Sequence, residues 1–140
     1  MSDVDFLDSN IIVYALDADS GAKGEVAARL LNTALRENNA VISFQVVQET
    51  LNVLGKFEKK LSPPDRLAVL NEVLAPLWRV FPSATLYARA LDVQERYQFG
   101  FYDSLIVAAA LEAGCARLLT EDLQDGQKIE SLTIANPFRE

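Results

Sequence analysis

The chain has 140 residues, of which 50% are hydrophobic and 24% charged, so composition indicates one globular domain with a hydrophobic core. It carries 13 basic and 20 acidic residues, a net charge of −7, and no histidine. The missing histidine excludes serine–histidine and cysteine–histidine catalysis and histidine-based zinc sites, which leaves any acid–base or metal chemistry to carboxylates. Such a negative charge is unusual for a nucleic-acid-binding protein, unless cations neutralise an acidic site or a basic face is hidden in the total.

No segment of the sequence resembles a membrane span or a signal peptide. Apolar runs fall well short of the roughly 20 residues that cross a bilayer, and no basic stretch followed by an apolar run opens the chain. The one cysteine, Cys115, cannot form an internal disulfide and is expected to be a small core residue. We therefore expect a cytoplasmic protein with a single domain over residues 1–140.

The first third of the chain predicts two short strands separated by helices. Residues 4–7 form the first predicted strand, which runs into Asp8 and then into a helix over residues 11–16. An amphipathic helix over residues 22–36 and a second strand over residues 40–42 follow. Asp8 thus stands at the carboxyl end of a strand, where ligands bind in open α/β sheets, although an aspartate there also serves as a helix cap.

The third predicted helix, over residues 44–60 with Ser43 as its N-cap, carries one acid on an apolar face. Glu49 lies three residues after Val46 and four before Val53, so it shares their side of the helix. Two interpretations remain open: a functional carboxylate, or a rim glutamate whose stem reaches solvent.

The same helix ends in three lysines, Lys56, Lys59 and Lys60, whose spacing places their charges on one side. Cations at a helix C-terminus interact favourably with the helix dipole, which is sufficient reason for their position. Contact with the phosphates of a substrate is the alternative.

The rest of the chain continues the alternation of helices and strands. The predicted elements are a helix over residues 63–74, a strand over 77–81, helices over 84–98 and 105–111, and strands over 117–119 and 131–135. On the helix over residues 84–98, Tyr87, Leu91 and Tyr97 are expected to face inward. This order predicts an α/β protein with a mainly parallel sheet and helices on both faces.

Two further acids occupy positions like that of Asp8. Asp103 lies just before the apolar run at residues 105–111, in the first turn of a helix that should be buried all round and end at Gly114. Free N–H groups there favour a carboxylate, so Asp103 is either a helix cap or a functional acid. Asp122 follows the strand over residues 117–119 and again places a carboxylate at the end of a strand.

Asp8, Glu49, Asp103 and Asp122 are spread over the chain, but right-handed crossovers would bring their junctions together at one edge of the sheet. Four clustered carboxylates repel one another, so protons or cations must intervene. Oxygen ligands without histidine or thiolate suit Mg²⁺ or Mn²⁺. Two such ions can activate water and stabilise the leaving oxygen of a phosphodiester. Acids near strand ends are common in α/β chains, so spacing alone leaves this site a hypothesis.

Five stretches carry a more specific signal. They are FLDSN at residues 6–10, QETL at 48–51, FYDSLIVAAA at 101–110, LLTED at 118–122 and IANPF at 134–138. Together they span nearly the whole chain, and they resemble the PIN-domain family, most closely the VapC-type ribonuclease toxins of bacterial toxin–antitoxin pairs.

The resemblance implies a three-layer α/β/α fold with a five-stranded sheet of order 3-2-1-4-5. It also implies that the four acids hold Mg²⁺ or Mn²⁺ and cut single-stranded or looped RNA. Ser9, Asn10 and Thr120 would support the site through hydroxyl or amide contacts. Asp125 corresponds to an extra acid of some members, although its neighbours depart from the family pattern. The expected partners are an RNA substrate, a second copy of the chain and a small antitoxin that blocks the site.

Three functions remain to be separated. The first is a metal-dependent endoribonuclease in which Asp8 and Asp103 are the main ligands, and Glu49 and Asp122 complete the shell or orient water. The second is a catalytically silent PIN-like module that keeps the fold and the acids for binding RNA or a partner. The third, a phosphatase-like enzyme with Asp8 as nucleophile, is disfavoured because Asn10 stands where a second aspartate would be needed.

Overall fold

The computed structural model describes residues 3–56 and 61–139. Its strands are β1 (Asp5–Leu7), β2 (Ala40–Ser43), β3 (Trp78–Val80), β4 (Arg117–Leu119), β5 (Lys128–Ile129) and β6 (Leu132–Ala135). Its helices are α1 (Ser9–Leu16), α2 (Gly21–Glu37), α3 (Phe44–Leu54), α4 (Pro63–Val69), the π-helical turn η1 (Leu70–Leu74), α5 (Ala75–Leu77), α6 (Ala84–Tyr97) and α7 (Phe101–Glu112).

The strands form one sheet of order β3-β2-β1-β4-β6-β5. The first five of these pair in parallel, which confirms the predicted order of a mainly parallel sheet. The predicted count of five strands is wrong by one, because β5 adds a short antiparallel partner to β6. β5 has only two residues, Lys128 and Ile129, and lies between turns at Gly126 and Glu130, so no period of alternation marks it in the sequence.

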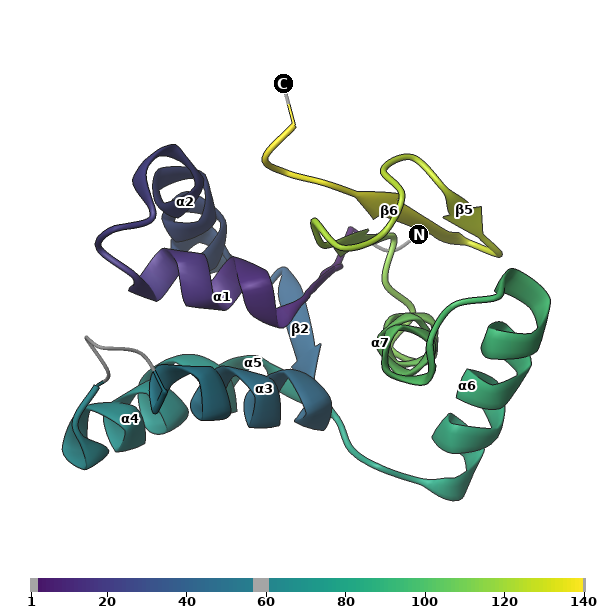
Figure 1. The fold of residues 1–140 in the computed structure, drawn as a ribbon, viewed down its shortest axis with the longest axis horizontal. Helices are drawn as coiled ribbons and strands as arrows, with labels where there is room; N and C mark the ends of the chain where they lie inside the picture. The colour runs from purple at the N-terminus through teal and green to yellow at the C-terminus, as the bar shows by residue number, and fades with distance from the viewer. Residues whose placement is uncertain (1–2, 57–60, 140) are drawn as a thin grey trace.

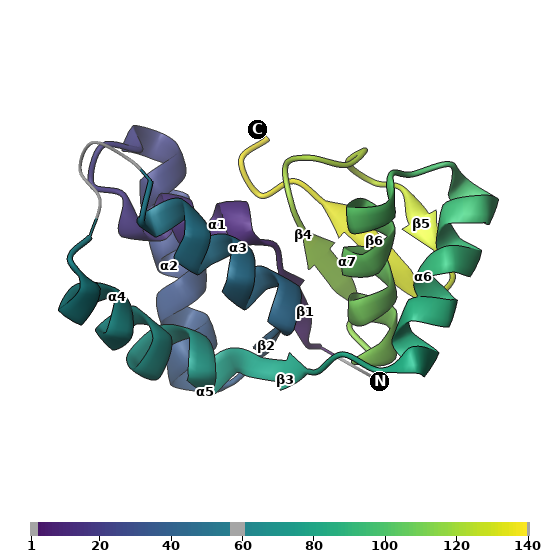
Figure 2. The same ribbon diagram turned by 60° about the horizontal axis from the view of Figure 1, so that its bottom comes forward.

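The sheet lies between helices, with α2 on one face and α7 on the other (Figures 1 and 2). Side chains alternate along β1, so Leu7 faces Val26 and Leu30 of α2 while Phe6 points to the opposite side. α7 is buried continuously from Ser104 to Leu111, as its apolar run predicted, and α6 packs beside it. This three-layer arrangement confirms the predicted fold class.

The helix that begins at Pro63 does not stop before Pro76, as the sequence predicted. It continues through η1, where the N–H of Ala75 donates to the carbonyl of Leu70 five residues earlier. Pro76 then lies one residue before the end of this continuous helix at Leu77, so its missing N–H interrupts only the last turn. The following strand is therefore shorter than predicted and begins only at Trp78.

The inward face of α6 was also predicted wrongly for two residues. Tyr87 and Leu91 are 38% and 57% exposed, whereas Leu86, Ala90 and Val93 are fully buried. Tyr87 and Leu91 directly follow Leu86 and Ala90 in the chain, so both sets recur at helical spacing. Hydrophobic periodicity alone therefore did not show which set faces the core. Cys115 is a buried core residue, as expected. Within the described part of the chain, no helix has the length and apolar character needed to cross a membrane.

Candidate active site

The carboxyl ends of β1 and β4 lie side by side and hold Asp8 firmly. The N–H of Asp8 donates to the carbonyl of Leu119 at 3.1 Å, which extends the pairing of the two strands by one residue. The Thr120 hydroxyl donates to Oδ2 of Asp8 at 2.8 Å, and the N–H of Ser9 donates to Oδ1 at 2.7 Å. Asp8 is therefore the N-cap of α1 and, at 6% exposure, a buried acid at the sheet edge.

Burial raises the pKa of Asp8 from 3.8 to about 6. The hydrogen bonds from Thr120 and Ser9 lower the pKa, but they only partly offset burial. The negative charges of Glu49 and Asp122 raise it further. Asp8 is thus a carboxylate whose ionised form a bound cation would stabilise strongly.

Asn10 links α1 to the acid that follows β4. Its Nδ2 donates to Oδ2 of Asp122 at 3.1 Å, while the N–H of Asp122 donates to the Thr120 hydroxyl oxygen at 3.1 Å. The other side-chain atom of Asn10, Oδ1, is buried and has no hydrogen-bond partner among the described residues. Asn10 therefore holds Asp122 and leaves an unsatisfied oxygen beside it.

α3 carries Glu49 to the same region. The helix begins where predicted, with the Ser43 hydroxyl accepting from the N–H of Val46 at 3.5 Å. Glu49 is half-buried, and burial raises its pKa above the usual value, as do the charges of Asp103 and Asp122. A hydrogen bond from the Ser9 hydroxyl partly offsets these effects. Glu49 is therefore half-buried and lies close enough to Asp103 and Asp122 for their charges to act on it.

Asp103 lies in the first turn of α7, as predicted, but it does not cap that helix in the part of the chain described. The N-cap is Gly100, which has no side chain to cap the helix, and the Ser104 hydroxyl donates to the Gly100 carbonyl at 2.9 Å. Burial raises the pKa of Asp103, and the charge of Asp122 adds to this. The carboxylate is thus left available to a ligand.

Gln45 is a residue that sequence reasoning missed. It is only 4% exposed, and its Nε2 donates to the carbonyl of Tyr102 at 3.1 Å, which ties α3 to the start of α7. Gln45 also hydrogen-bonds Glu49, four residues later on the same face of α3. The spacing of four residues was the signal available in the sequence, because it places the Gln45 amide one helical turn before the Glu49 carboxylate.

The four acids come from β1, α3, α7 and the turn after β4, and each interacts electrostatically with others of the set. Across residues 3–56 and 61–139, no ion pair neutralises any of them. Within the same residues, no three acids, histidines or cysteines are grouped tightly enough to hold a metal ion. The donors nevertheless fit Mg²⁺ or Mn²⁺, because Mg²⁺ commonly keeps several waters and takes only one or two carboxylates directly.

The lysines predicted at the end of α3 are only partly described. α3 ends at Leu54, earlier than predicted, and Gly55 and Lys56 form a turn in which Lys56 is exposed. Lys59 and Lys60 lie outside the described residues. Lys56 therefore does not continue the helical face that carries Glu49.

Asp125 is placed next to the C-terminal segment. Its Oδ1 accepts from the N–H of Asn136 at 2.8 Å, and its Oδ2 lies 4.0 Å from a guanidinium nitrogen of Arg139. Its charge is not among those that shift the pKa of Asp8, Glu49 or Asp103. These contacts give Asp125 a local role in holding the end of the chain.

A second cluster, also missed by sequence reasoning, adjoins the four acids. Glu121 accepts from the Tyr14 hydroxyl through Oε1 and pairs with Lys23 through Oε2 at 2.8 Å. Burial alone would raise the pKa of Glu121, but the hydrogen bonds from Lys23 and Tyr14 lower it below its usual value. Glu121 is therefore compensated by its partners, unlike the four acids.

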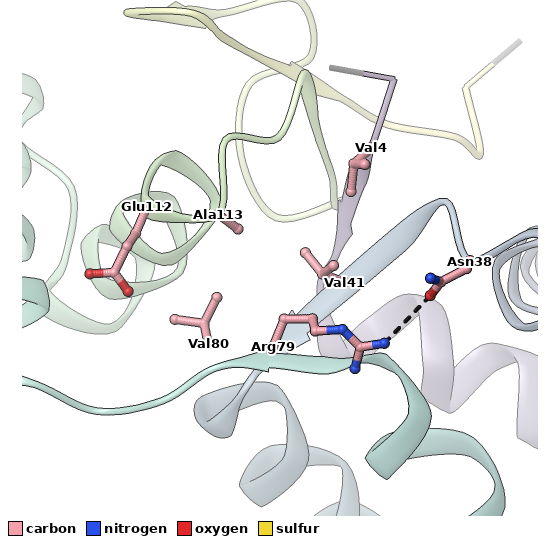
Figure 3. Close-up of a pocket in the computed structure, with 7 residues that line it drawn as sticks. All are labelled: Val4, Asn38, Val41, Arg79, Val80, Glu112 and Ala113. Atoms are coloured by element: carbon pink, nitrogen blue, oxygen red, sulfur yellow. Dashed lines mark hydrogen bonds between the residues drawn. The ribbon is translucent and has the colours of Figure 1, made fainter. Parts of the chain in front are cut away.

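A cavity of about 420 Å³ lies at the end of the strands opposite to the four acids (Figure 3). Its walls include Val4, which precedes β1, and Asn38, which precedes β2, so it lies at the amino ends of these parallel strands. Arg79 reaches across it, with Nη2 3.5 Å from Oδ1 of Asn38. The carboxylates lie at the carboxyl ends, so this cavity is not part of their site.

Comparison with known proteins gives one family. The family model described as the PIN domain matches residues 6–125. No curated protein is significantly similar in sequence.

Solved structures share the fold over most of the chain. A toxin–antitoxin complex from Klebsiella pneumoniae has a TM-score of 0.66 at 20% identity, with 96% of this chain and 98% of that chain covered. VapBC2 from Rickettsia felis, bound to a DNA fragment from its promoter, has a TM-score of 0.69 at 21% identity, covering 95% and 98%. VapC20 from Mycobacterium tuberculosis, a toxin that cleaves the sarcin–ricin loop, has a TM-score of 0.59 at 18% identity, covering 81% and 86%.

Proposed function

The chain belongs to the PIN-domain family, and we propose that it is a Mg²⁺- or Mn²⁺-dependent endoribonuclease that acts as the toxin of a toxin–antitoxin pair. The observation that carries this proposal is the state of Asp8. It is a buried acid, fixed by two hydrogen bonds, with its pKa raised to about 6 and other acids nearby. No side-chain cation within the described residues pairs with these acids, so a metal ion is the natural counter-charge.

In the proposed site, Asp8 and Asp103 hold the ion, and Glu49 and Asp122 complete the shell or orient water. When bound, Mg²⁺ or Mn²⁺ would lower the pKa of water and stabilise the leaving oxygen of the phosphodiester. In-line attack of a water oxygen on phosphorus would break the bond to the 3′ oxygen and leave 3′-hydroxyl and 5′-phosphate ends.

The surrounding residues would fix this arrangement. The Thr120 hydroxyl and the Ser9 N–H hold Asp8, and the Ser9 hydroxyl holds Glu49. The unpaired Oδ1 of Asn10 would accept a hydrogen bond from water at the site.

The structural relatives support two of the proposed partners, an antitoxin and an RNA substrate. Two of these relatives are toxin–antitoxin structures, and a third is a toxin that cleaves an RNA loop. By analogy, we propose a looped or single-stranded RNA substrate, a small antitoxin that covers the site, and a homodimer in the cytoplasm. An acidic protein of net charge −7 would favour a basic segment in such an antitoxin.

The test is RNA cleavage by the purified protein freed of any partner. Cleavage of a structured RNA is expected with Mg²⁺ or Mn²⁺, and EDTA should abolish it. The Asp8→Asn variant, purified in parallel, should lack the activity and thereby exclude a contaminating nuclease. Undiminished cleavage in EDTA would contradict the metal mechanism.

A second function is favoured by one observation: no three acids within the described residues are grouped closely enough to hold a metal ion. In this alternative the chain is a silent module that binds RNA or a partner without cutting. RNA binding that persists in EDTA, with no cleavage in either metal by wild type, would favour the module over the nuclease.

A further inference from the structure

α1 holds two successive acids of the turn after β4 through two side chains. Asn10 donates from Nδ2 to Asp122 at 3.1 Å, and the Tyr14 hydroxyl donates to Oε1 of Glu121. Asn10 and Tyr14 are four residues apart, so they lie one above the other on the same face of α1. Helix α1 therefore binds both Asp122 and Glu121 through side chains on one of its faces.

Glu121 is held on both of its oxygens. Oε2 pairs with Lys23 of α2 at 2.8 Å, and Lys23 lies 5.2 Å from the ring centroid of Tyr14 and 5.7 Å from that of Phe138. The rings of Tyr14 and Phe138 pack edge to face at 5.3 Å. Tyr14 of α1 and Lys23 of α2 thus converge on one carboxylate that is not itself in the acidic site, and Phe138 packs against both of these residues.

The side chain of Asp122 is exposed, so its orientation depends on the hydrogen bond from Asn10 and on the backbone that carries it. The backbone N–H of Asp122 donates to the Thr120 hydroxyl oxygen at 3.1 Å, and the Thr120 N–H donates to the Ala135 carbonyl at 3.1 Å. The next residue after Thr120 is Glu121, so fixing Glu121 restricts how Asp122 turns toward the other acids.

We propose that the cluster of Tyr14, Lys23 and Glu121 positions Asp122 for metal binding. This role rests on the proposed function, in which Asp122 is a ligand. Glu121 is then a positioning residue and not a ligand, because Tyr14 and Lys23 occupy its oxygens. Tyr14 and Lys23 act on Asp122 only through Glu121.

The first readout needs no metal. The side-chain amide of Asn10 reports the position of Asp122, because its Nδ2 is bonded to that carboxylate. In NMR spectra of the metal-free protein, Tyr14→Phe and Glu121→Gln should shift this amide resonance and speed its exchange with water. Tyr14→Phe removes only the hydroxyl and keeps the ring against Phe138, so the variant should fold.

The second readout is the Mn²⁺ affinity, measured by calorimetry at 25 °C without RNA. Both variants should bind Mn²⁺ about tenfold more weakly than wild type, as is typical when a residue supporting a metal ligand is lost. Lys23→Met should weaken binding similarly, and Lys23→Arg should restore it because the charge and the contact with the rings are retained.

The control is the ion pair of Arg89 and Glu130, in which Nη2 lies 3.2 Å from Oε1 and both side chains are partly exposed. Arg89→Gln should change neither the Asn10 resonance nor the Mn²⁺ affinity. If Tyr14→Phe and Glu121→Gln lower the melting temperature yet leave both readouts unchanged, the cluster is only structural and the proposal is wrong. Failure of wild type to bind Mn²⁺ would instead contradict the proposed function, while the Asn10 resonance would still decide whether Glu121 positions Asp122.

Discussion

The Thr120 hydroxyl donates a 2.8 Å hydrogen bond to Oδ2 of Asp8, joining residues that lie 112 positions apart in the chain. Both are buried, at 0% and 6% exposure, and both follow neighbouring parallel strands. The bond favours the ionised form of Asp8 against the cost of burial. The first and the fourth acidic segments of the sequence are therefore joined by one hydroxyl group.

Removing that hydroxyl should destabilise the protein and raise the pKa of Asp8 further. For Thr120→Val, we expect a loss of about 1–3 kcal/mol at neutral pH, because both the Asp8 carboxylate and the Asp122 N–H lose the Thr120 hydroxyl as a partner. Denaturant unfolding in EDTA measures the loss. Thr50→Val is the matched control, because the Thr50 hydroxyl is buried without a partner among the described residues. A similar loss in both variants would show that the bond to Asp8 contributes nothing specific.

Asp8 should make the metal-free protein less stable as the pH rises. Its pKa is about 6 when folded and 3.8 ordinarily, so the folded state binds more protons between these values. Stability should therefore fall as the pH rises from about 4 to about 6 and stay reduced above that, by at most about 3 kcal/mol. Asp8→Asn should lack this fall and still cap α1. Melting temperatures from pH 4 to pH 8 in EDTA would show it, and equal slopes for both proteins would contradict it.

Asp103→Asn should separate stability from metal binding. Without metal, the variant should melt at or above the wild-type temperature near neutral pH, because burial and Asp122 both raise the pKa of Asp103. Mg²⁺ should raise the wild-type melting temperature more than that of the variant, since a ligand of the native state stabilises it. Asp65→Asn is the control, as Asp65 also lies in a first helical turn. An equal response of wild type and Asp103→Asn to Mg²⁺ would assign Asp103 a structural role.

Gln45 should matter for both the fold and the site. Gln45→Met should cost about 0.5–1.5 kcal/mol, the usual net contribution of one hydrogen bond, because it removes the 3.1 Å bond from Nε2 to the Tyr102 carbonyl. It should also weaken Mn²⁺ binding, since the link between α3 and α7 sets the separation of Glu49 and Asp103. Calorimetry and thermal melts measure the two effects. Gln48→Met, at an exposed position of the same helix, should change neither.

The three lysines test how an acidic protein binds RNA. Replacing Lys56, Lys59 and Lys60 by Gln should weaken RNA binding and flatten its dependence on salt, since fewer phosphates are neutralised. Binding titrations at several salt concentrations in EDTA give the slope, with Arg89→Gln as a control for loss of charge. An unchanged slope would show that the three lysines do not contact the RNA phosphates.

The sequence by itself determined the features that depend on local pattern. The unbroken apolar run of α7 required burial on all sides, and Ser43 capped α3 where predicted. The alternation of short strands and helices predicted a mainly parallel sheet, which the strand pairing confirms, whereas the strand order was implied by the resemblance to the PIN-domain family. The same pattern predicted that Asp8 and Asp122 follow the carboxyl ends of strands, and β1 and β4, which precede them, are neighbours in the sheet.

Only the tertiary structure decided contacts between residues that are distant in sequence or lack a period. The two residues of β5 form a strand because they pair with the neighbouring strand β6. On α6, packing against the rest of the protein determined that Leu86, and not Tyr87, faces inward. The partnership of Tyr14 with Glu121 joins residues 107 positions apart, and no local rule links a tyrosine to a glutamate at that distance. Propensity and period act over one or two turns of chain, whereas the hydrogen bonds that orient the acids depend on which surfaces the fold brings together.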